Sequence, residues 1–293
     1  MEVKPYIIDN FIYNGEPIVE FRLKYMNDFV DEFFITEARY TFSGNIKQEL
    51  YIEKYRDIFE PYIHKITFLI IDSFPKITNK QLEQWLNIKK TTSLFIKTAF
   101  KKYQYSYSFY IPWFNEDYQR NYSRNFIIEK YKNKKYIVFC CDADEIPVRN
   151  LKYLITNYHY PLFYEPHSLK MDIICYNFYW YWDCPEYYNQ EAFVVNDIGF
   201  QKNETAYMRD NIYLSKGLKN AGWHCSYFMN IEDIVRKIES FSHMELNQNK
   251  IKDKKNILEC IKTGTCYITG NKFKEYPIEK RPEDWNNLFF NLN

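Results

Sequence analysis

Apolar residues gather in four short runs along the first half of the chain. The runs are residues 6–12, 33–35, 66–71 and 136–141. Between them, residues 17–29 place apolar side chains at helical spacing, and residues 115–131 predict a helix with a polar face. Apolar runs separated by helical patterns are typical of a parallel sheet covered by helices on both faces. The pattern therefore predicts an α/β fold.

The second half of the chain has a different pattern. Residues 162–195 contain aromatic stretches that favour strands, and residues 231–241 and 253–261 predict helices. Gly264 and Gly270 mark turns. Because the sequence contains no internal repeat, no low-complexity linker and no Pro/Gly-rich boundary, we expect a single domain over residues 1–293.

Charge and composition narrow the possible partners. The 39 basic and 38 acidic residues leave a net charge of +1, which predicts neither a nucleic-acid partner nor an anionic membrane surface. Aromatic residues make up 20% of the chain, and Tyr, Lys, Asn and Ile are abundant while Gly is scarce. An AT-rich coding genome combined with core packing explains this excess, and a sugar-binding surface is the alternative explanation.

The sequence predicts a cytoplasmic protein without a membrane span. No apolar stretch approaches the roughly 20 residues that cross a bilayer, and the N-terminus lacks the apolar region of a signal peptide. The seven cysteines are an odd number and form no CxxC pair. Cys140 and Cys141 lie inside an apolar run, where they act as small hydrophobic residues. We therefore expect a reducing compartment, with no disulfide framework and no zinc site.

The most informative stretch is the acidic hexapeptide at residues 142–147, DADEIP. A buried strand delivers Asp142 to the sheet edge, and Asp144 follows two residues later. In an extended segment these two carboxylates point the same way, and two oxygen donors suit Mg²⁺ or Mn²⁺. An isolated acidic triplet is more often a helix cap or a solvated turn. Phosphatases and nucleotidyltransferases also hold metal ions with aspartates at strand ends.

The sequence as a whole resembles glycosyltransferase family 17. The segments that carry the resemblance, in chain order, are residues 11–22, 30–44, 72–75, 113–120, 142–147, 221–226, 258–264 and 275–277. The resemblance implies a GT-A fold, with a mixed, mainly parallel central sheet flanked by helices. It also implies a nucleotide-sugar-binding half over residues 1–147 and an acceptor-binding half over residues 148–293.

The resemblance further implies a reaction. Family members include the enzyme that adds the bisecting N-acetylglucosamine to N-glycans in β1,4 linkage, so we expect a metal-dependent inverting transferase. The donor would be a UDP-sugar, with N-acetylglucosamine as the expected sugar, and the acceptor a glycan or glycoprotein. Vertebrate members carry a Golgi anchor. The AT-rich, anchorless chain fits a microbe or a virus in its host's cytoplasm, which leaves the acceptor open.

The resemblance assigns roles to the acidic motif and to one histidine. Asp142 and Asp144 would be the metal and diphosphate residues, and His224 would complete the metal site for Mn²⁺ or Mg²⁺. A structural histidine held by Trp223 is the alternative for His224. The side chain of Glu145 should point away from the Asp142 and Asp144 pair, and an ion pair with an arginine is one interpretation of it.

Three further residues are expected to bind the nucleotide sugar. Glu37 ends a predicted strand, where an acidic side chain can bind uridine or ribose; an ion pair with Arg22 or Arg39 is the alternative. Arg22 and Arg120 suit diphosphate recognition because a guanidinium forms paired hydrogen bonds to anions. Arg124 shares a helix face with Arg120, and a solvated helix face is the competing explanation for it. His243 is expected to be a helix cap or a surface residue.

Inversion requires one general base on the acceptor side. Glu191 is the preferred base and Asp183 the next; the other carboxylates considered are Glu186, Glu232 and Asp233. Residues 176–182 offer aromatic faces for a sugar ring, or else belong to the core. Two other functions stay open: a non-catalytic glycan-binding protein on the same fold, and a metal-dependent phosphatase or nucleotidyltransferase, which lacks support because the sequence contains no Gly-rich phosphate loop.

Overall fold

A computed structural model describes residues 4–93, 96, 106–157, 163–183, 192–212 and 217–282. Its first sheet has six strands in the order β3-β2-β1-β4-β9-β6. The first four are parallel, β9 runs antiparallel to β4, and β6 runs antiparallel to β9. This sheet confirms the predicted α/β class and its mixed, mainly parallel sheet. The strands are β1 (Tyr6–Ile12), β2 (Glu32–Ala38), β3 (Ile66–Ile71), β4 (Tyr136–Asp142), β6 (His167–Ser168) and β9 (Phe193–Asn196).

Helices connect and cover these strands. They are α1 (Val19–Met26), α2 (Tyr51–Lys54), α3 (Arg56–Phe59), η1 (Glu60–Lys65), α4 (Asn79–Thr92), η2 (Tyr107–Tyr110), α6 (Ile111–Tyr122), α7 (Arg124–Lys130), α8 (Asn150–Asn157), α9 (Asp197–Lys202) and α10 (Thr205–Asn211). The single helix predicted over residues 115–131 is wrong in one respect. The chain breaks at the buried Ser123, so that α6 and α7 are separate helices.

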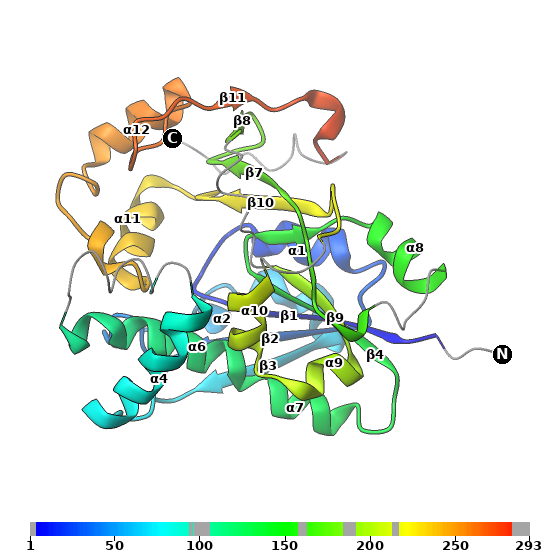
Figure 1. The fold of residues 1–293 in the computed structure, drawn as a ribbon. Helices are drawn as coiled ribbons and strands as arrows, with labels where there is room; N and C mark the ends of the chain where they lie inside the picture. The colour runs from blue at the N-terminus through cyan, green and yellow to red at the C-terminus, as the bar shows by residue number, and fades with distance from the viewer. Residues whose placement is uncertain are drawn as a thin grey trace.

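A second sheet lies above the first in Figure 1 and has five strands in the order β11-β8-β7-β10-β5. Its strands are β5 (Glu145–Pro147), β7 (Asp172–Cys175), β8 (Trp180–Tyr181), β10 (Gly222–Ser226) and β11 (Lys274–Glu275). Beside it lie α11 (Ile231–Ser240), η6 (Met244–Leu246), α12 (Lys254–Thr263) and η7 (Ile278–Lys280). The turn predicted at Gly264 is confirmed, because this glycine ends α12 in the left-handed conformation with φ of 62°.

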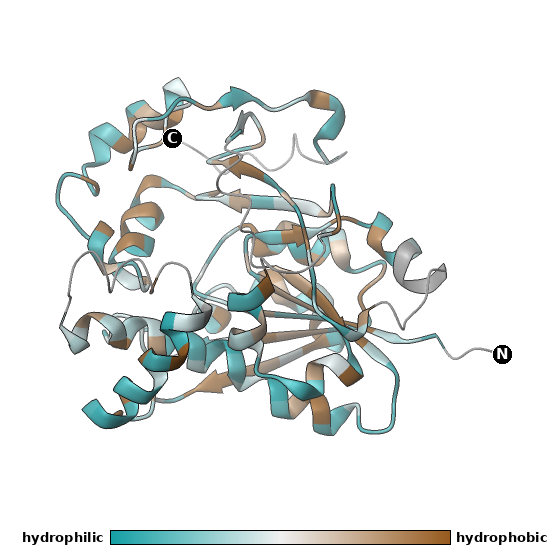
Figure 2. Ribbon diagram, in the orientation of Figure 1, coloured by the Kyte–Doolittle hydropathy of each residue, from teal (hydrophilic) through white to brown (hydrophobic). Residues whose placement is uncertain are grey.

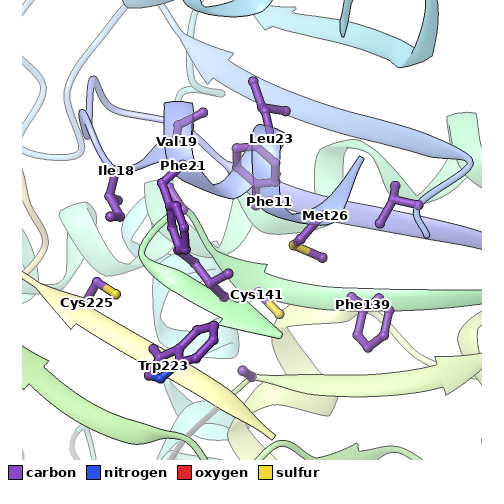
Figure 3. Close-up of a cluster of buried hydrophobic side chains, with 14 of the residues drawn as sticks. Phe11, Ile18, Val19, Phe21, Leu23, Met26, Phe139, Cys141, Trp223 and Cys225 are labelled. Atoms are coloured by element: carbon purple, nitrogen blue, oxygen red, sulfur yellow. The ribbon is translucent and has the colours of Figure 1, made fainter. Parts of the chain in front are cut away.

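One apolar core joins the two sheets. Figure 3 shows α1 side chains, among them Phe21, packed between strand residues of the first sheet and Trp223 and Cys225 of β10. Phe21 and Trp223 have ring centroids 6.5 Å apart. Cys141 of β4 lies in the same core and is buried, as its apolar surroundings in the sequence predicted. The position of the second sheet relative to β4 is therefore set by shared packing.

The outer surface has the opposite character. Figure 2 shows brown, apolar strands in the first sheet and a largely teal α4 at the periphery. Within the described ranges, no helix is both long and apolar enough to cross a bilayer.

Candidate active site

A cavity of about 700 Å³ opens beside the end of β4. Its lining includes residues of α4, α6, α10 and the loop that follows β1, together with residues of β7, β10 and α11. The acidic residues Asp142 and Asp144 both line it. The carboxyl ends of parallel strands are where open α/β sheets bind ligands, so the cavity lies where the topology predicts a site.

The acidic turn links the two sheets. Asp142 is the last residue of β4, which pairs with β1 through Ile12. Three residues later, Glu145 begins β5 and pairs antiparallel with His224 of β10. The chain therefore leaves the first sheet at Asp142 and enters the second at Glu145. Asp144 lies between these two points, and its carbonyl accepts a hydrogen bond of 2.7 Å from the backbone N–H of Cys225.

Two arginines hold Asp142. Arg120 of α6 donates to both oxygens of this carboxylate, with Nη2 3.2 Å from Oδ2, and Arg209 of α10 donates to Oδ2 at 2.8 Å. Burial alone would raise the pKa of Asp142, but the charges of Arg120 and Arg209 outweigh it and hold the pKa well below its ordinary value. Asp142 is therefore ionised and fixes two guanidinium groups at the cavity wall.

Glu145 completes this arginine network. Arg209 donates to both of its oxygens, at 3.0 Å and 3.1 Å, and the backbone N–H of Asp142 donates to Oε2 at 2.6 Å. The ion pair with an arginine that the sequence offered as one interpretation of Glu145 is therefore present. Because Arg209 binds Asp142 and Glu145 together, it also fixes the shape of the acidic turn.

Asp144 has a different set of partners. Lys237 of α11 donates to Oδ2 at 2.9 Å, and Nε2 of His224 lies 3.9 Å from Oδ1. Burial would raise the pKa of Asp144, but the ammonium of Lys237 outweighs it, and the pKa lies below its ordinary value. Asp142 and Asp144 both line the cavity, but they bind cations that come from different elements.

The donor chemistry around Asp144 suits a divalent cation. A carboxylate and an imidazole lie side by side on the cavity wall, and such ions also accept water and substrate phosphate oxygens as ligands. The oxygens of Asp142 are instead occupied by the two arginines. No group of three or more His, Cys, Asp or Glu side chains that could hold a metal ion occurs among the residues that the structure describes.

Arg22 lies beneath the acidic turn rather than in the cavity lining. Its side chain is fully buried and binds Asp9 through Nε at 2.8 Å and Nη2 at 2.6 Å. Its Nη1 donates to the carbonyls of Asp142 at 2.8 Å and Glu145 at 2.6 Å, and more weakly to that of Ala143. These contacts are structural, because they fix the backbone that carries the acidic motif.

Glu37 also lies outside the cavity lining. One oxygen accepts from the backbone N–H of Tyr51 at 2.8 Å and from Nζ of Lys47 at 2.9 Å, and the other accepts from the N–H of Ile52 at 2.9 Å. It therefore caps the beginning of α2. The alternative predicted from the sequence, an ion pair with Arg22 or Arg39, is wrong because those arginines bind Asp9 and Asp72 instead.

The other residues singled out from the sequence have other surroundings. Arg120 lines the cavity, whereas Arg124 donates to the carbonyls of Phe200, Gln201 and Asn203 at the end of α9. His243 lines the cavity too, and its Nδ1 lies 2.6 Å from Oε1 of Glu245.

Of the carboxylates considered as the general base, the three in the described part of the chain (Asp183, Glu232 and Asp233) lie outside the cavity lining. Asp183 lies 2.5 Å from Nζ of Lys274, and Glu232 lies 2.9 Å from Nζ of Lys254. Asp233 forms an ion pair with Arg236 one turn along α11. Glu186 and Glu191 lie outside the described residues.

Among the described residues, seven charged members of the cavity lining were not predicted from the sequence: Glu16, Lys89, Glu116, Asp117, Arg209, Asp210 and Lys237. Glu116 was the most accessible to prediction, because it stands four residues before Arg120 on the predicted helix and binds its guanidinium at 2.5 Å. Burial raises the pKa of Glu116, but Arg120 outweighs it and the net pKa is lowered. Arg209 and Lys237 carry no local signal, since their partners are distant in sequence.

The aromatic run at residues 176–182 divides between the core and the cavity. Tyr176 and Phe178 are buried, whereas Trp182 lines the cavity, as do Trp113 and Phe42. Core packing therefore explains part of this run, and one ring is available to a ligand.

Comparison with known proteins identifies the family. A search of curated proteins returned no match to the chain. The family model for glycosyltransferase family 17 matches residues 79–269, a range that includes the acidic turn, His224 and Lys237. The segments before residue 79 and after residue 269 that resemble the family lie outside this match. Because the match covers more than half of the 293 residues, the chain belongs to glycosyltransferase family 17.

Proposed function

We propose that this glycosyltransferase transfers a sugar, with N-acetylglucosamine as the first candidate, from a UDP-sugar to a glycan hydroxyl in β linkage. The observation that carries the proposal is the cavity at the end of β4, where ionised Asp142 and Asp144 lie among the cations Arg120, Arg209 and Lys237. Mixed charge of this kind suits a nucleoside diphosphate, whose phosphates need cations.

Arg120 and Arg209 are the proposed diphosphate ligands. Both guanidinium groups are held in place by Asp142, so their orientation is set before the donor binds. Donors that are already oriented stabilise charge on a leaving group without the cost of reorganisation. In this proposal Asp142 acts through the two arginines and does not contact the cation directly.

The proposed cofactor is Mn²⁺ or Mg²⁺. Asp144 and His224 would hold it, and the bound ion would supply positive charge to the departing diphosphate. The arrangement is proposed as a GT-A fold, with the parallel strands of the first sheet binding the nucleotide and the second half of the chain binding the acceptor.

Inversion at the anomeric carbon needs a base that removes the proton of the acceptor hydroxyl while an oxocarbenium-like state develops. Glu191 remains the proposed base, and the alternative, Asp183, is not proposed because it binds Lys274 outside the cavity lining. Trp182 is proposed to stack on a sugar ring, because aromatic faces pack against the apolar face of a sugar.

The proposal is tested by thermal stabilisation with UDP, measured with Mn²⁺ and with EDTA, followed by a screen of UDP-sugars for metal-dependent hydrolysis. We expect a larger UDP shift with Mn²⁺ than with EDTA, because at a given concentration a ligand that binds more tightly stabilises the native state more. No UDP shift under either condition would refute the proposed donor. Glycan binding in EDTA together with no hydrolysis of any UDP-sugar would favour the non-catalytic glycan-binding protein.

A further inference from the structure

Lys237 occupies a position that the proposed cofactor also requires. It belongs to α11, which begins after Asn230, and its ammonium points into the cavity. Nζ lies 2.9 Å from Oδ2 of Asp144 and 3.9 Å from Oε1 of Glu16. The ring of Tyr227 lies on another side, with its centroid 5.5 Å from Nζ. One ammonium therefore neutralises two carboxylates that come from different parts of the chain.

The two carboxylate oxygens of Asp144 have different contacts. Oδ2 accepts from Lys237, whereas Oδ1 faces His224 across 3.9 Å, beyond hydrogen-bond length. A divalent cation bound by Asp144 and His224 would lie next to a lysine ammonium, and the two positive charges would repel each other. The ammonium and the cation thus compete for the same carboxylate.

Lysine is suited to give way in such a competition. Its ammonium is a point charge on a flexible four-carbon stem, and the side chain of Lys237 is 24% exposed. By contrast, Arg120 and Arg209 are each bound by two carboxylates and cannot turn without breaking both contacts. When a diphosphate enters the cavity together with a cation, it brings new oxygens within reach of the lysine.

We propose that Lys237 is an exchangeable counter-ion: it holds Asp144 while the site is empty, and it moves to the donor diphosphate when a divalent cation binds Asp144. The inference rests on the proposed function. It makes cation and nucleotide binding cooperative, because each removes an obstacle to the other. Reciprocity then requires UDP to tighten Mn²⁺ binding by the same factor by which Mn²⁺ tightens UDP binding.

The test uses Lys237→Met and Lys237→Arg in the full chain. Mn²⁺ affinity without nucleotide is measured from the free-ion EPR signal, and UDP affinity at saturating Mn²⁺ is measured by calorimetry. Lys237→Met should bind Mn²⁺ alone at least tenfold more tightly, and it should bind UDP at saturating Mn²⁺ at least fivefold more weakly. Lys237→Arg should bind Mn²⁺ alone more weakly than the wild type, because a guanidinium holds a carboxylate through paired hydrogen bonds.

Lys252→Met is the matched control. Lys252 lies in the turn before α12, binds Glu239 of α11 at 2.8 Å and is outside the cavity lining, so both affinities should stay at the wild-type value. If circular dichroism shows that Lys237→Met does not fold, Lys237→Arg tests the proposal alone. Weaker Mn²⁺ binding by this variant than by the wild type supports the role of Lys237. If the wild type binds UDP and Mn²⁺ but the Lys237 variants have unchanged Mn²⁺ affinity, the role of Lys237 is overturned and the proposed function stands. A wild type that binds no UDP overturns the proposed function and this inference with it.

Discussion

Replacing Arg22 with methionine removes the guanidinium that supports the acidic turn from below. Methionine keeps much of the apolar stem, so the change isolates the loss of charge and hydrogen bonds. Asp9 would remain as a buried carboxylate without its partner, since both side chains of this pair have no exposed surface. Breaking a buried pair in this way costs about 3–5 kcal/mol.

The carbonyls above the guanidinium add to this cost. Asp142 and Glu145 would lose bonds of 2.8 Å and 2.6 Å, and each buried acceptor left without a donor costs about 1–3 kcal/mol. We therefore expect Arg22→Met to lower the free energy of unfolding by at least about 4 kcal/mol, a large part of the roughly 5–15 kcal/mol of a typical protein. Urea unfolding followed by tryptophan fluorescence measures this difference.

Two controls separate the buried pair from general effects of the substitution. Arg39→Met removes an exposed arginine bonded to Asp72 at 2.9 Å, and such pairs contribute about 0–1 kcal/mol. The double variant Asp9→Asn with Arg22→Met should lose less than the sum of the two single variants, by about 0.5–3 kcal/mol, because the two residues are in contact. A loss below about 1 kcal/mol in Arg22→Met, together with lost UDP binding, would refute the reasoning and make Arg22 a donor ligand.

Three further predictions concern the site. Asp144→Ala should abolish the Mn²⁺-dependent part of the UDP thermal shift and keep the fold, and an unchanged shift would exclude Asp144 as a cation ligand. If Glu191 is the base, Glu191→Gln should lower kcat in a transferase assay by about 10²–10⁴-fold with little change in KM. Arg120 holds the pKa of Glu116 below its ordinary value despite burial, so this carboxylate contributes stability above its unfolded pKa and loses it as the pH falls through the lower folded pKa. Urea unfolding from about pH 6 to about pH 3 should therefore show a smaller acid loss in Glu116→Gln than in the wild type.

The parallel strands were predictable because they are mainly apolar: β1, β2 and β4 are buried on both faces, and β3 at the sheet edge is half-buried. β3 and β4 read as continuous apolar runs, ITFLII and YIVFCCD, and no other element of that length has the same pattern. The acidic residues at the end of β4 were predictable for the same reason, since a strand of known direction delivers Asp142 to the ligand-binding edge. For these strands, the local sequence alone indicates both the secondary structure and the position in the fold.

The second sheet was not predictable in this way. β8 and β11 have two residues each, and β5 has three, so their alternation of side chains is too short to recognise. Their pairing depends on distant segments, as when Glu145 of β5 pairs with His224 of β10. The single central sheet expected from the sequence is therefore completed by a separate sheet that only tertiary packing specifies.

The same reasoning explains the site residues. Glu37 was correctly expected at the end of a strand, but its partner is the N-terminus of α2, whose approach the sequence does not reveal. Lys237 meets Asp144 across 93 residues of chain, and Arg209 meets Asp142 across 67. The sequence shows which charged residues are candidates for the site, whereas the fold decides which of them come into contact.

The acidic turn divides its two aspartates between two structural layers. Asp142 ends a strand of the first sheet and binds α6 and α10, whereas Asp144 binds α11 and the backbone of β10 in the second layer. A relative movement of the layers would therefore separate the arginines from Lys237 and His224. Arg22 opposes that movement, because its guanidinium binds carbonyls of both Asp142 and Glu145, one at the end of each layer. The residue beneath the turn thus sets the distance between the two arginines and Lys237, on which the proposed binding of a diphosphate depends.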